Sequence, residues 1–345
     1  MIWLTWRQFR AAGAMMFAAL AVLAALLALT GPGLAGDYST GIAACTTQSG
    51  GCSNFVQHFF RDHQGPFLAL SAVVLVLPAL IGLFWGAPLL TRELEAGTHR
   101  LVWNQSVTRT RWLAVKLALT GLAAMTAAGL GSLAVTWWSS PIDKTATNFP
   151  KMGPLLFDAR GIVPIAYAAF AFALGVTVGM LVRRTLPALA VTLVVFLAVQ
   201  IAMPLLVRPH LLPPTRSTIE ITTANVGDFY GGRPPGEGGG DSAVRVTVKG
   251  PSDTGAWVLS SQTVDASGHT VDSIPVSTSA GPCAPSQHGI SPCLAEIKRL
   301  GYRQQLTYQP SSRFWPFQWY ETGIYTALAL SLAGFCFWWI RRRLS

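Results

Sequence analysis

Long apolar stretches separated by polar segments dominate the pattern of the chain. A helix that crosses a bilayer needs about 20 consecutive apolar residues, and six stretches approach or exceed that length. They are residues 11–30, 67–90, 117–138, 162–182, 186–207 and 323–340. The pattern therefore predicts an all-α polytopic membrane bundle of six transmembrane helices, with both termini on one side.

The first stretch also has features of a secretory signal peptide. Arg7 and Arg10 precede it and glycines follow it. Its apolar run is longer than the roughly 7 to 15 residues of a signal peptide. We therefore expect a retained anchor, which places residues 1–207 in the membrane part.

A long polar segment, residues 208–322, separates the fifth and sixth stretches. Val244, Val246 and Val248 alternate with polar residues, as in a half-buried strand. Leu294, Ile297 and Leu300 follow helical spacing instead. The segment is predicted to form an α+β or β-rich domain, and residues 323–345 the sixth helix with a basic tail.

Charge gives these elements an orientation. Hydrophobic residues make up 51% and charged residues 12% of the chain, whose net charge is +10, whereas about a quarter of a soluble domain is charged. If the N-terminus is inside, only Glu93 and Glu95 oppose the inner cations, so the whole net charge lies inside. These cations are Arg7, Arg10, Arg92, Arg100, Arg109, Arg111, Lys116, Arg183, Arg184, Arg341, Arg342 and Arg343. The positive-inside rule then predicts cytoplasmic termini and an extracytoplasmic domain at 208–322. No nucleic-acid partner is expected, because the cations are not clustered on one soluble face.

Four cysteines fall on the predicted outer side, where an oxidising environment permits disulfides. Four cysteines allow three pairings. Cys45–Cys52 and Cys283–Cys293 close the shortest loops and are favoured, although the sequence leaves the connectivity open. His58 and His63 lack a third ligand, so no metal site is predicted. Scattered Ser, His and Asp residues nominate no catalytic triad.

The six stretches contain no Asp, Glu, Lys, Arg or His. Because ion-coupled transporters usually carry such groups within the membrane, ion coupling is disfavoured. No lysine follows a glycine, so the chain lacks the phosphate-binding loop of ATPases. No cofactor is expected on this chain, and ATP-driven work would need a partner ATPase that binds ATP and Mg.

The predicted inner loop, residues 91–116, combines a charged start, a Gly-Thr break and a short apolar segment. This arrangement is typical of an amphipathic element that docks on a partner, with its apolar residues in a groove and its carboxylates against cations. A plain interfacial loop is the alternative. The residues of the predicted contact are Arg92, Glu93, Glu95, Gly97, Thr98, Leu101, Val102 and Trp103.

The Arg-Glu-x-Glu-Ala-Gly-Thr run and the Val-Thr-Arg-x-x-Trp-Leu-x-x-Lys run that leads into the third stretch resemble the permease subunit of type-2 ABC transporters, in the form common among actinobacteria. The resemblance implies that the loop is a coupling helix for an ABC ATPase and that residues 1–10 form an interfacial helix. It also implies a second permease copy or homologue. Family members have a short helical connection where this chain has residues 208–322.

Two polar or small-residue features fall inside the apolar stretches. Gly175 and Gly179 form a Gly-x-x-x-Gly face for close helix packing, which we expect to be used within the bundle. Gln200 is the most polar side chain deep in a stretch. It is a candidate for a substrate path, and an interhelical hydrogen bond is the alternative.

The leading hypothesis is a permease subunit that exports a hydrophobic or amphipathic compound across the cell membrane, in contact with the lipid bilayer. The main alternative is a receptor or scaffold whose outer domain binds a ligand and whose inner loop recruits a partner. A membrane enzyme with an outer catalytic domain is a third reading. The sequence shows neither the inner signalling domain nor the converging ionisable residues that these alternatives need.

Overall fold

The computed structural model describes residues 2–47, 52–96, 108–146, 149–223, 225–232, 243–248, 255–278, 280–284 and 289–342. The chain divides into two compact units. One, here called the bundle, comprises Met1–Phe149, Pro154–Leu211 and Phe314–Ser345. The other, here called the β-unit, comprises Pro150–Gly153 and Leu212–Arg313.

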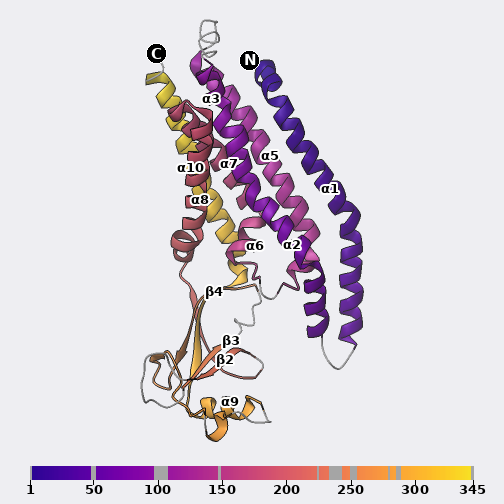
Figure 1. Cartoon of the computed structure of the whole chain (residues 1–345), viewed down its shortest axis with the longest axis vertical. Coiled ribbons are helices and arrows are strands. Elements are labelled where there is room, and N and C mark those ends of the chain that lie inside the picture. Colours follow the sequence, from indigo (N-terminus) through magenta and orange to yellow (C-terminus); the bar gives the residue numbers. More distant parts are fainter. Residues whose placement is uncertain are drawn as a thin grey trace. The chain divides into compact units, whose positions relative to one another are not determined.

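Helices make up the bundle, and the described part of the chain holds six that are long and apolar enough to cross a membrane. The six predicted helices are thus confirmed (Figure 1). The elements are α1 (Ile2–Thr46), α2 (Ser53–Ile81), the π-helical turn η1 (Gly82–Gly86), α3 (Ala87–Glu95), α5 (Arg109–Asp143), α6 (Pro154–Ala159), α7 (Val163–Val182), α8 (Thr185–Ala202), the turns η2 (Met203–Val207) and η3 (Arg208–His210), and α10 (Phe314–Arg342).

Helix α7 forms the centre of the bundle. It is apolar on all sides and almost completely buried, as expected for a helix that other helices surround. It packs against α10, α5, α8 and the continuous α2–η1–α3 rod. Helix α1 lies instead along α5 and leaves most of its own surface exposed.

Glycines allow α7 to approach the α2–η1–α3 rod closely. A Cβ atom at Gly175 would lie 2.3 Å from the carbonyl oxygen of Gly82, and one at Gly179 would lie 2.5 Å from that of Ala87. On the rod, Gly86 faces the carbonyl oxygen of Phe172 in the same way. The Gly175-x-x-x-Gly179 face is therefore used inside the bundle, as predicted.

Helices α1 and α2 extend beyond the predicted apolar stretches. Helix α1 continues to Thr46 and α2 begins at Ser53, whereas the first predicted apolar stretch ends at residue 30 and the second begins at residue 67. Helix α1 begins at Ile2, so the helix expected for residues 1–10 is continuous with the first spanning helix, and its position at the membrane interface stays a prediction. Polar residues interrupt the apolar pattern here without breaking the helix, because a helical hydrogen-bond ladder tolerates polar side chains.

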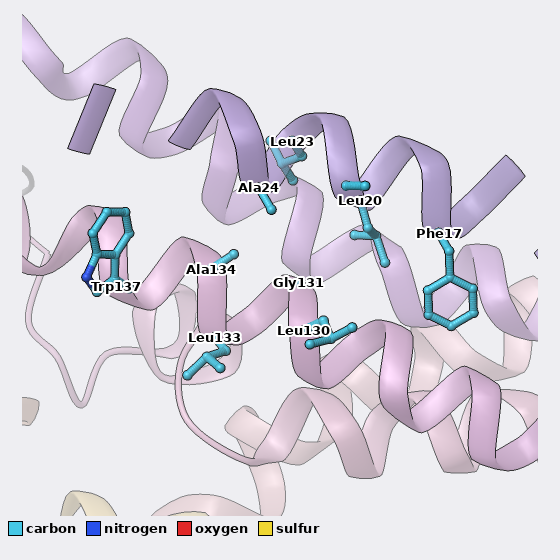
Figure 2. Close-up of a pocket in the computed structure, with 10 residues that line it drawn as sticks. Phe17, Leu20, Leu23, Ala24, Leu130, Gly131, Leu133, Ala134 and Trp137 are labelled. Carbon is cyan, nitrogen blue, oxygen red and sulfur yellow. The ribbon is translucent and has the colours of Figure 1, made fainter. Parts of the chain in front are cut away.

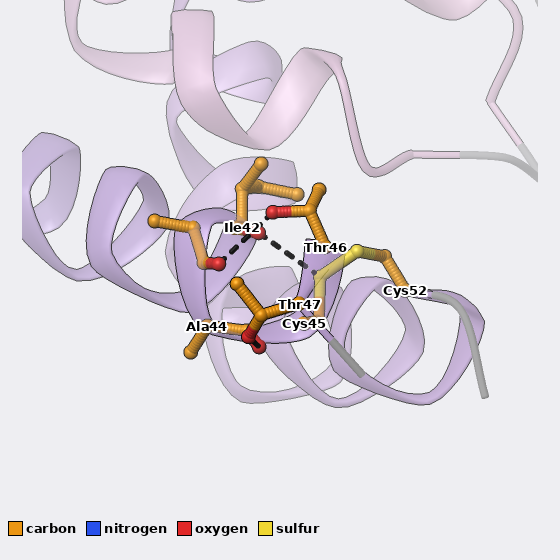
Figure 3. Close-up of a disulfide and its surroundings, with 7 residues drawn as sticks. Ile42, Ala44, Cys45, Thr46, Thr47 and Cys52 are labelled. Carbon is orange, nitrogen blue, oxygen red and sulfur yellow. Dashed lines mark hydrogen bonds between the residues drawn. A yellow bond between two sulfur atoms is a disulfide. The ribbon is translucent and has the colours of Figure 1, made fainter. Parts of the chain in front are cut away.

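A disulfide between Cys45 and Cys52 joins the end of α1 to the start of α2 (Figure 3). A second disulfide joins Cys283 to Cys293 in the β-unit. These are the local pairs that the sequence favoured. Cys336 is a buried free thiol in α10.

The β-unit contains β1 (Thr215–Glu220), β2 (Val226–Gly232), β3 (Ala243–Val248), β4 (Trp257–Val264), β5 (Thr270–Val271), α9 (Ser291–Arg299) and β6 (Arg303–Gln309). Four strands form an antiparallel sheet in the order β1-β6-β4-β5, and β2 pairs with β3. Strand β3 contains the predicted Val244–Val248 alternation, and α9 contains Leu294 and Ile297. These side chains and the Cys283–Cys293 disulfide share one core.

Strands β1 and β6 bring the two ends of the β-unit together, because Thr215 pairs with Tyr308. Gln309 donates a hydrogen bond from Nε2 to the carbonyl oxygen of Leu212, and Arg313 donates one to that of Pro213. A domain whose ends lie close together can be inserted between two helices without separating them.

Candidate functional site

The end of α3 precedes the predicted coupling segment and is fastened to α5 by a buried ion pair. Lys116 Nζ lies 2.5 Å from Glu93 Oε1, and these side chains are only 3% and 14% exposed. Lys116 also lies over the ring of Trp112, 4.9 Å from its centroid. Because a buried charge is stable only when it is paired, this contact holds α3 and α5 together.

A second contact joins α3 to the first residue of α8. Thr185 donates hydrogen bonds to the Glu95 carboxylate from Oγ1 at 2.7 Å and from its backbone nitrogen at 3.4 Å. A carboxylate at a helix N-terminus interacts favourably with the helix dipole. The last turn of α3 is therefore linked both to α5 and to α8.

These contacts correct one expectation. Glu93 was expected to pair with cations of a partner, but the structure buries it against Lys116 within the chain. Arg92 and Glu95 are exposed and remain accessible to a partner. Gly97, Thr98, Leu101, Val102 and Trp103 lie outside the described residues, so their role in coupling stays a prediction.

At the end of the bundle away from the termini, where α6 lies (Figure 1), a buried ionic group surrounds Arg208. Arg208 donates from Nε and from one terminal nitrogen to the two carboxylate oxygens of Glu321, each at 2.8 Å, and also to Asp158. The Tyr167 hydroxyl donates to Glu321 and lies 3.0 Å from Asp158. We call these four residues the Arg208 cluster.

The cluster is almost completely removed from solvent. The side chains of Arg208 and Glu321 are 0% exposed and that of Asp158 is 11% exposed. The Arg208 guanidinium lies 4.3 Å from the centroid of the Phe157 ring. Burial raises the pKa of Asp158 to about 6, against the opposing attraction of Arg208.

A neighbouring set of polar contacts fixes the start of α7. The Gln318 side-chain oxygen accepts hydrogen bonds from the backbone nitrogens of Ile162 and Val163 at 2.9 and 3.0 Å. Its nitrogen donates to the carbonyl oxygen of Arg160. Arg160 itself pairs with Asp143 at 3.2 Å. Helices α5, α7 and α10 are thus joined by polar contacts at this end.

The sequence did not reveal the Arg208 cluster. Arg208 follows the fifth apolar stretch directly and Glu321 precedes the sixth by two residues, so both lie just outside the apolar stretches. Helix α10 and the helical region of α8, η2 and η3 extend past those limits. Buried ionisable side chains are therefore present within the helical regions that contain the fifth and sixth apolar stretches.

An apolar groove of about 660 Å³ runs between α1 and α5 (Figure 2). Leu20 and Ala24 line it from α1, and Leu130, Ala134 and Trp137 line it from α5. A second hollow of about 560 Å³ between the same helices shares Phe17 with it. The walls of the groove are apolar and suit alkyl or aromatic groups, whereas Arg10 adds a cation to the wall of the second hollow.

Gln200 forms an interhelical contact. The Tyr325 hydroxyl of α10 donates a hydrogen bond to its side-chain oxygen at 2.6 Å. This geometry agrees with the interhelical hydrogen bond that the sequence offered as the alternative to a substrate path. Among the described residues, no group of three or more His, Cys, Asp and Glu side chains is arranged to hold a metal.

The six apolar helices and the charged contacts at both ends define a polytopic membrane protein. The model of the family described as ABC-2 membrane transporter related matches residues 17–208, which is more than half of the chain, and the chain belongs to this family. The match ends at Arg208 and does not include the β-unit segment 212–313. No curated protein and no solved structure matches the chain.

Proposed function

We propose that the chain is the membrane subunit of an ATP-driven exporter that works with a separate ABC ATPase and a second copy or homologue of itself. The observation that carries this proposal is the attachment of the α3 end to α5 and α8 through Glu93 and Glu95. A push on the segment that follows α3 would reach both helices. Family membership supports the assignment as a transport component.

The glycine contacts extend the mechanical unit. Because backbone atoms of η1 and α3 touch those of α7 at Gly175 and Gly179, α3 cannot shift without α7 shifting or the contact opening. ATP would drive the change by binding more tightly to the ATPase in the state that holds the coupling segments together. Helix α7 would then carry that motion to the Arg208 cluster through Tyr167.

The proposed cargo is a hydrophobic or amphipathic compound. Support comes from the apolar groove between α1 and α5, which is wide enough for alkyl or aromatic groups. Helix α1 also leaves a broad apolar surface exposed, which would face lipid, cargo or the second copy. Cytoplasmic termini and an extracytoplasmic β-unit complete the proposal and rest on the one-sided distribution of Lys and Arg.

The test is reconstitution. The tagged chain, purified from its native membrane, is expected to bring down an ABC ATPase, and the pair in lipid vesicles should hydrolyse ATP and move a fluorescent amphiphile. A matched ATPase variant that cannot hydrolyse ATP should abolish the movement. Recovery of the chain without any ATPase would contradict the proposal, and ligand binding by the β-unit in that preparation would favour the receptor alternative.

A further inference from the structure

A pocket of about 270 Å³ opens between α1, the η1–α3 segment and α5. One part of its wall is aromatic and comes from Phe9, Phe84 and Trp85, whereas the other part is charged and comes from Arg92, Glu93 and Lys116. Glu93 and Lys116 neutralise each other. Arg92 therefore gives the wall a net positive charge.

The apolar pattern of three helices indicates the level of the bilayer at which the pocket lies. Phe9 lies two residues before the first apolar stretch, Arg92 lies two residues after the second, and Lys116 lies one residue before the third. All three helices thus pass from polar to apolar sequence at the pocket. In a bilayer this level belongs to the lipid headgroups.

We propose that this pocket binds one anionic phospholipid. Its phosphate accepts hydrogen bonds from Arg92, and from Lys116 through protons that Glu93 does not use. Guanidinium groups bind phosphate by charge-assisted, often bidentate hydrogen bonds, and basic pockets between membrane helices bind anionic headgroups. The first part of an acyl chain lies against Phe84, which is 61% exposed, and against Leu89 beside it.

The lipid would bridge α1, α3 and α5 immediately before the predicted coupling segment. Its presence would favour the arrangement in which these helices stand as described, because a ligand stabilises the conformation that it binds. The inference does not depend on the proposed function, since binding is tested on the chain alone.

The test uses the full-length chain in detergent, titrated with phosphatidylglycerol or phosphatidylcholine and followed by native mass spectrometry. One phosphatidylglycerol is expected to bind at least about tenfold more tightly than phosphatidylcholine. Arg92→Gln should weaken phosphatidylglycerol about tenfold. Arg111→Gln removes the same charge from an exposed position on α5 outside the pocket and should leave binding within about twofold of the wild type.

A second variant tests the shape of the pocket without changing charge. Ala12→Phe places a ring in the pocket wall and should also weaken phosphatidylglycerol, with an unfolding temperature close to that of the wild type as proof of folding. Equal binding of the two lipids would overturn the proposal, as would phosphatidylglycerol binding that neither Arg92→Gln nor Ala12→Phe weakens. Competition by glycerol phosphate as strong as that by the lipid would overturn it in favour of a soluble phosphate ligand.

Discussion

Arg208 and Glu321 are 113 residues apart in the sequence and form two hydrogen bonds of 2.8 Å inside the bundle. Arg208 lies just before the β-unit segment begins at Leu212, and Glu321 lies shortly after it ends at Arg313. The pair therefore holds together the two helical ends between which the β-unit is inserted. A bundle closed in this way can accommodate a large insertion without losing the packing of α10.

The first prediction concerns the stability of this closure. Arg208→Met leaves Asp158 and Glu321 buried without their cation, and breaking such a pair typically costs about 3 to 5 kcal/mol. We expect a corresponding loss in the free energy of unfolding of the full chain in detergent, measured by reversible denaturation in sodium dodecyl sulfate. Glu296→Gln removes a surface pair with Arg299, whose side chain is 70% exposed, and should cost less than about 1 kcal/mol. Equal effects of the two variants would contradict the structural role of the cluster.

The second prediction follows from the raised pKa of Asp158. An unfolded aspartate titrates near pH 3.9, whereas burial raises the pKa of Asp158 to about 6 in the folded chain. The folded state therefore binds the proton more tightly. The contribution of this proton to the free energy of unfolding is fully present below about pH 4 and is lost as pH rises to about 6. Its full size is on the order of 3 kcal/mol.

For three carboxylates of the β-unit, the free energy of unfolding changes with pH in the opposite direction. Hydrogen bonds from Lys298, Ser267 and Arg299 lower the pKa values of Glu220, Asp265 and Glu296 respectively, so their contribution is lost as pH falls. The comparison of wild type with Asp158→Asn isolates the buried group. The difference in unfolding free energy between the two should change between pH 4 and pH 6 and stay constant from pH 6.5 to 8. A difference that is constant throughout would refute the assignment.

The third prediction tests the close approach of α7 to the rod. In Gly175→Ala the new Cβ atom would clash with the Gly82 carbonyl oxygen and with the Ala87 nitrogen. Overpacking of this kind costs about 1 to 3 kcal/mol. Gly36→Ala, on the exposed part of α1 where nothing lies within 4 Å, is the matched control and should not destabilise the chain, because alanine is the better helix former. The unfolding temperatures of both variants, compared with that of the wild type, test this prediction.

Local patterns in the sequence predicted the helices but could not predict the ionic contacts. Apolar runs identified six helices, and the Val244–Val248 alternation identified β3, because both depend on neighbouring residues. Asp158, Arg208 and Glu321 come together only through tertiary packing, and no pattern in the sequence relates them. The Glu93–Lys116 pair joins residues 23 positions apart, across a segment that was treated as one docking element. Polar residues within α1 likewise limited the apolar stretch to residues 11–30, so the full length of the helix could not be predicted from it.

The fourth prediction concerns topology. The Lys and Arg distribution predicts that residues 208–322 lie outside and the loop 91–116 inside. Single cysteines introduced at Gly238 and at His99 should differ in reactivity: a membrane-impermeant maleimide added to intact cells should label only Gly238→Cys. Permeabilised cells provide the control, in which His99→Cys should also react. Labelling of His99→Cys in intact cells would show that the proposed orientation is wrong.

The fifth prediction concerns the coupling segment. A tryptophan anchor buried in a partner's groove is typically worth about 2 kcal/mol or more, whereas an exposed charge contributes less than about 1 kcal/mol. Glu95 is exposed and already accepts hydrogen bonds from Thr185. Trp103→Ala should therefore weaken association with the ATPase more than Glu95→Gln does, and should lower transport-coupled ATP hydrolysis without preventing membrane insertion.

Arg342→Ala is the control for that comparison, because Arg342 is an exposed cation at the end of α10 whose loss should change neither association nor hydrolysis. Co-purification measures association, and ATP hydrolysis in lipid vesicles measures coupling. A drop in hydrolysis with unchanged association would place Trp103 in the transmission of motion rather than in docking. If Trp103→Ala retained both the partner and the activity of the wild type, residues 97–107 would have to be regarded as a plain interfacial loop, and the ATPase would have to act through another surface.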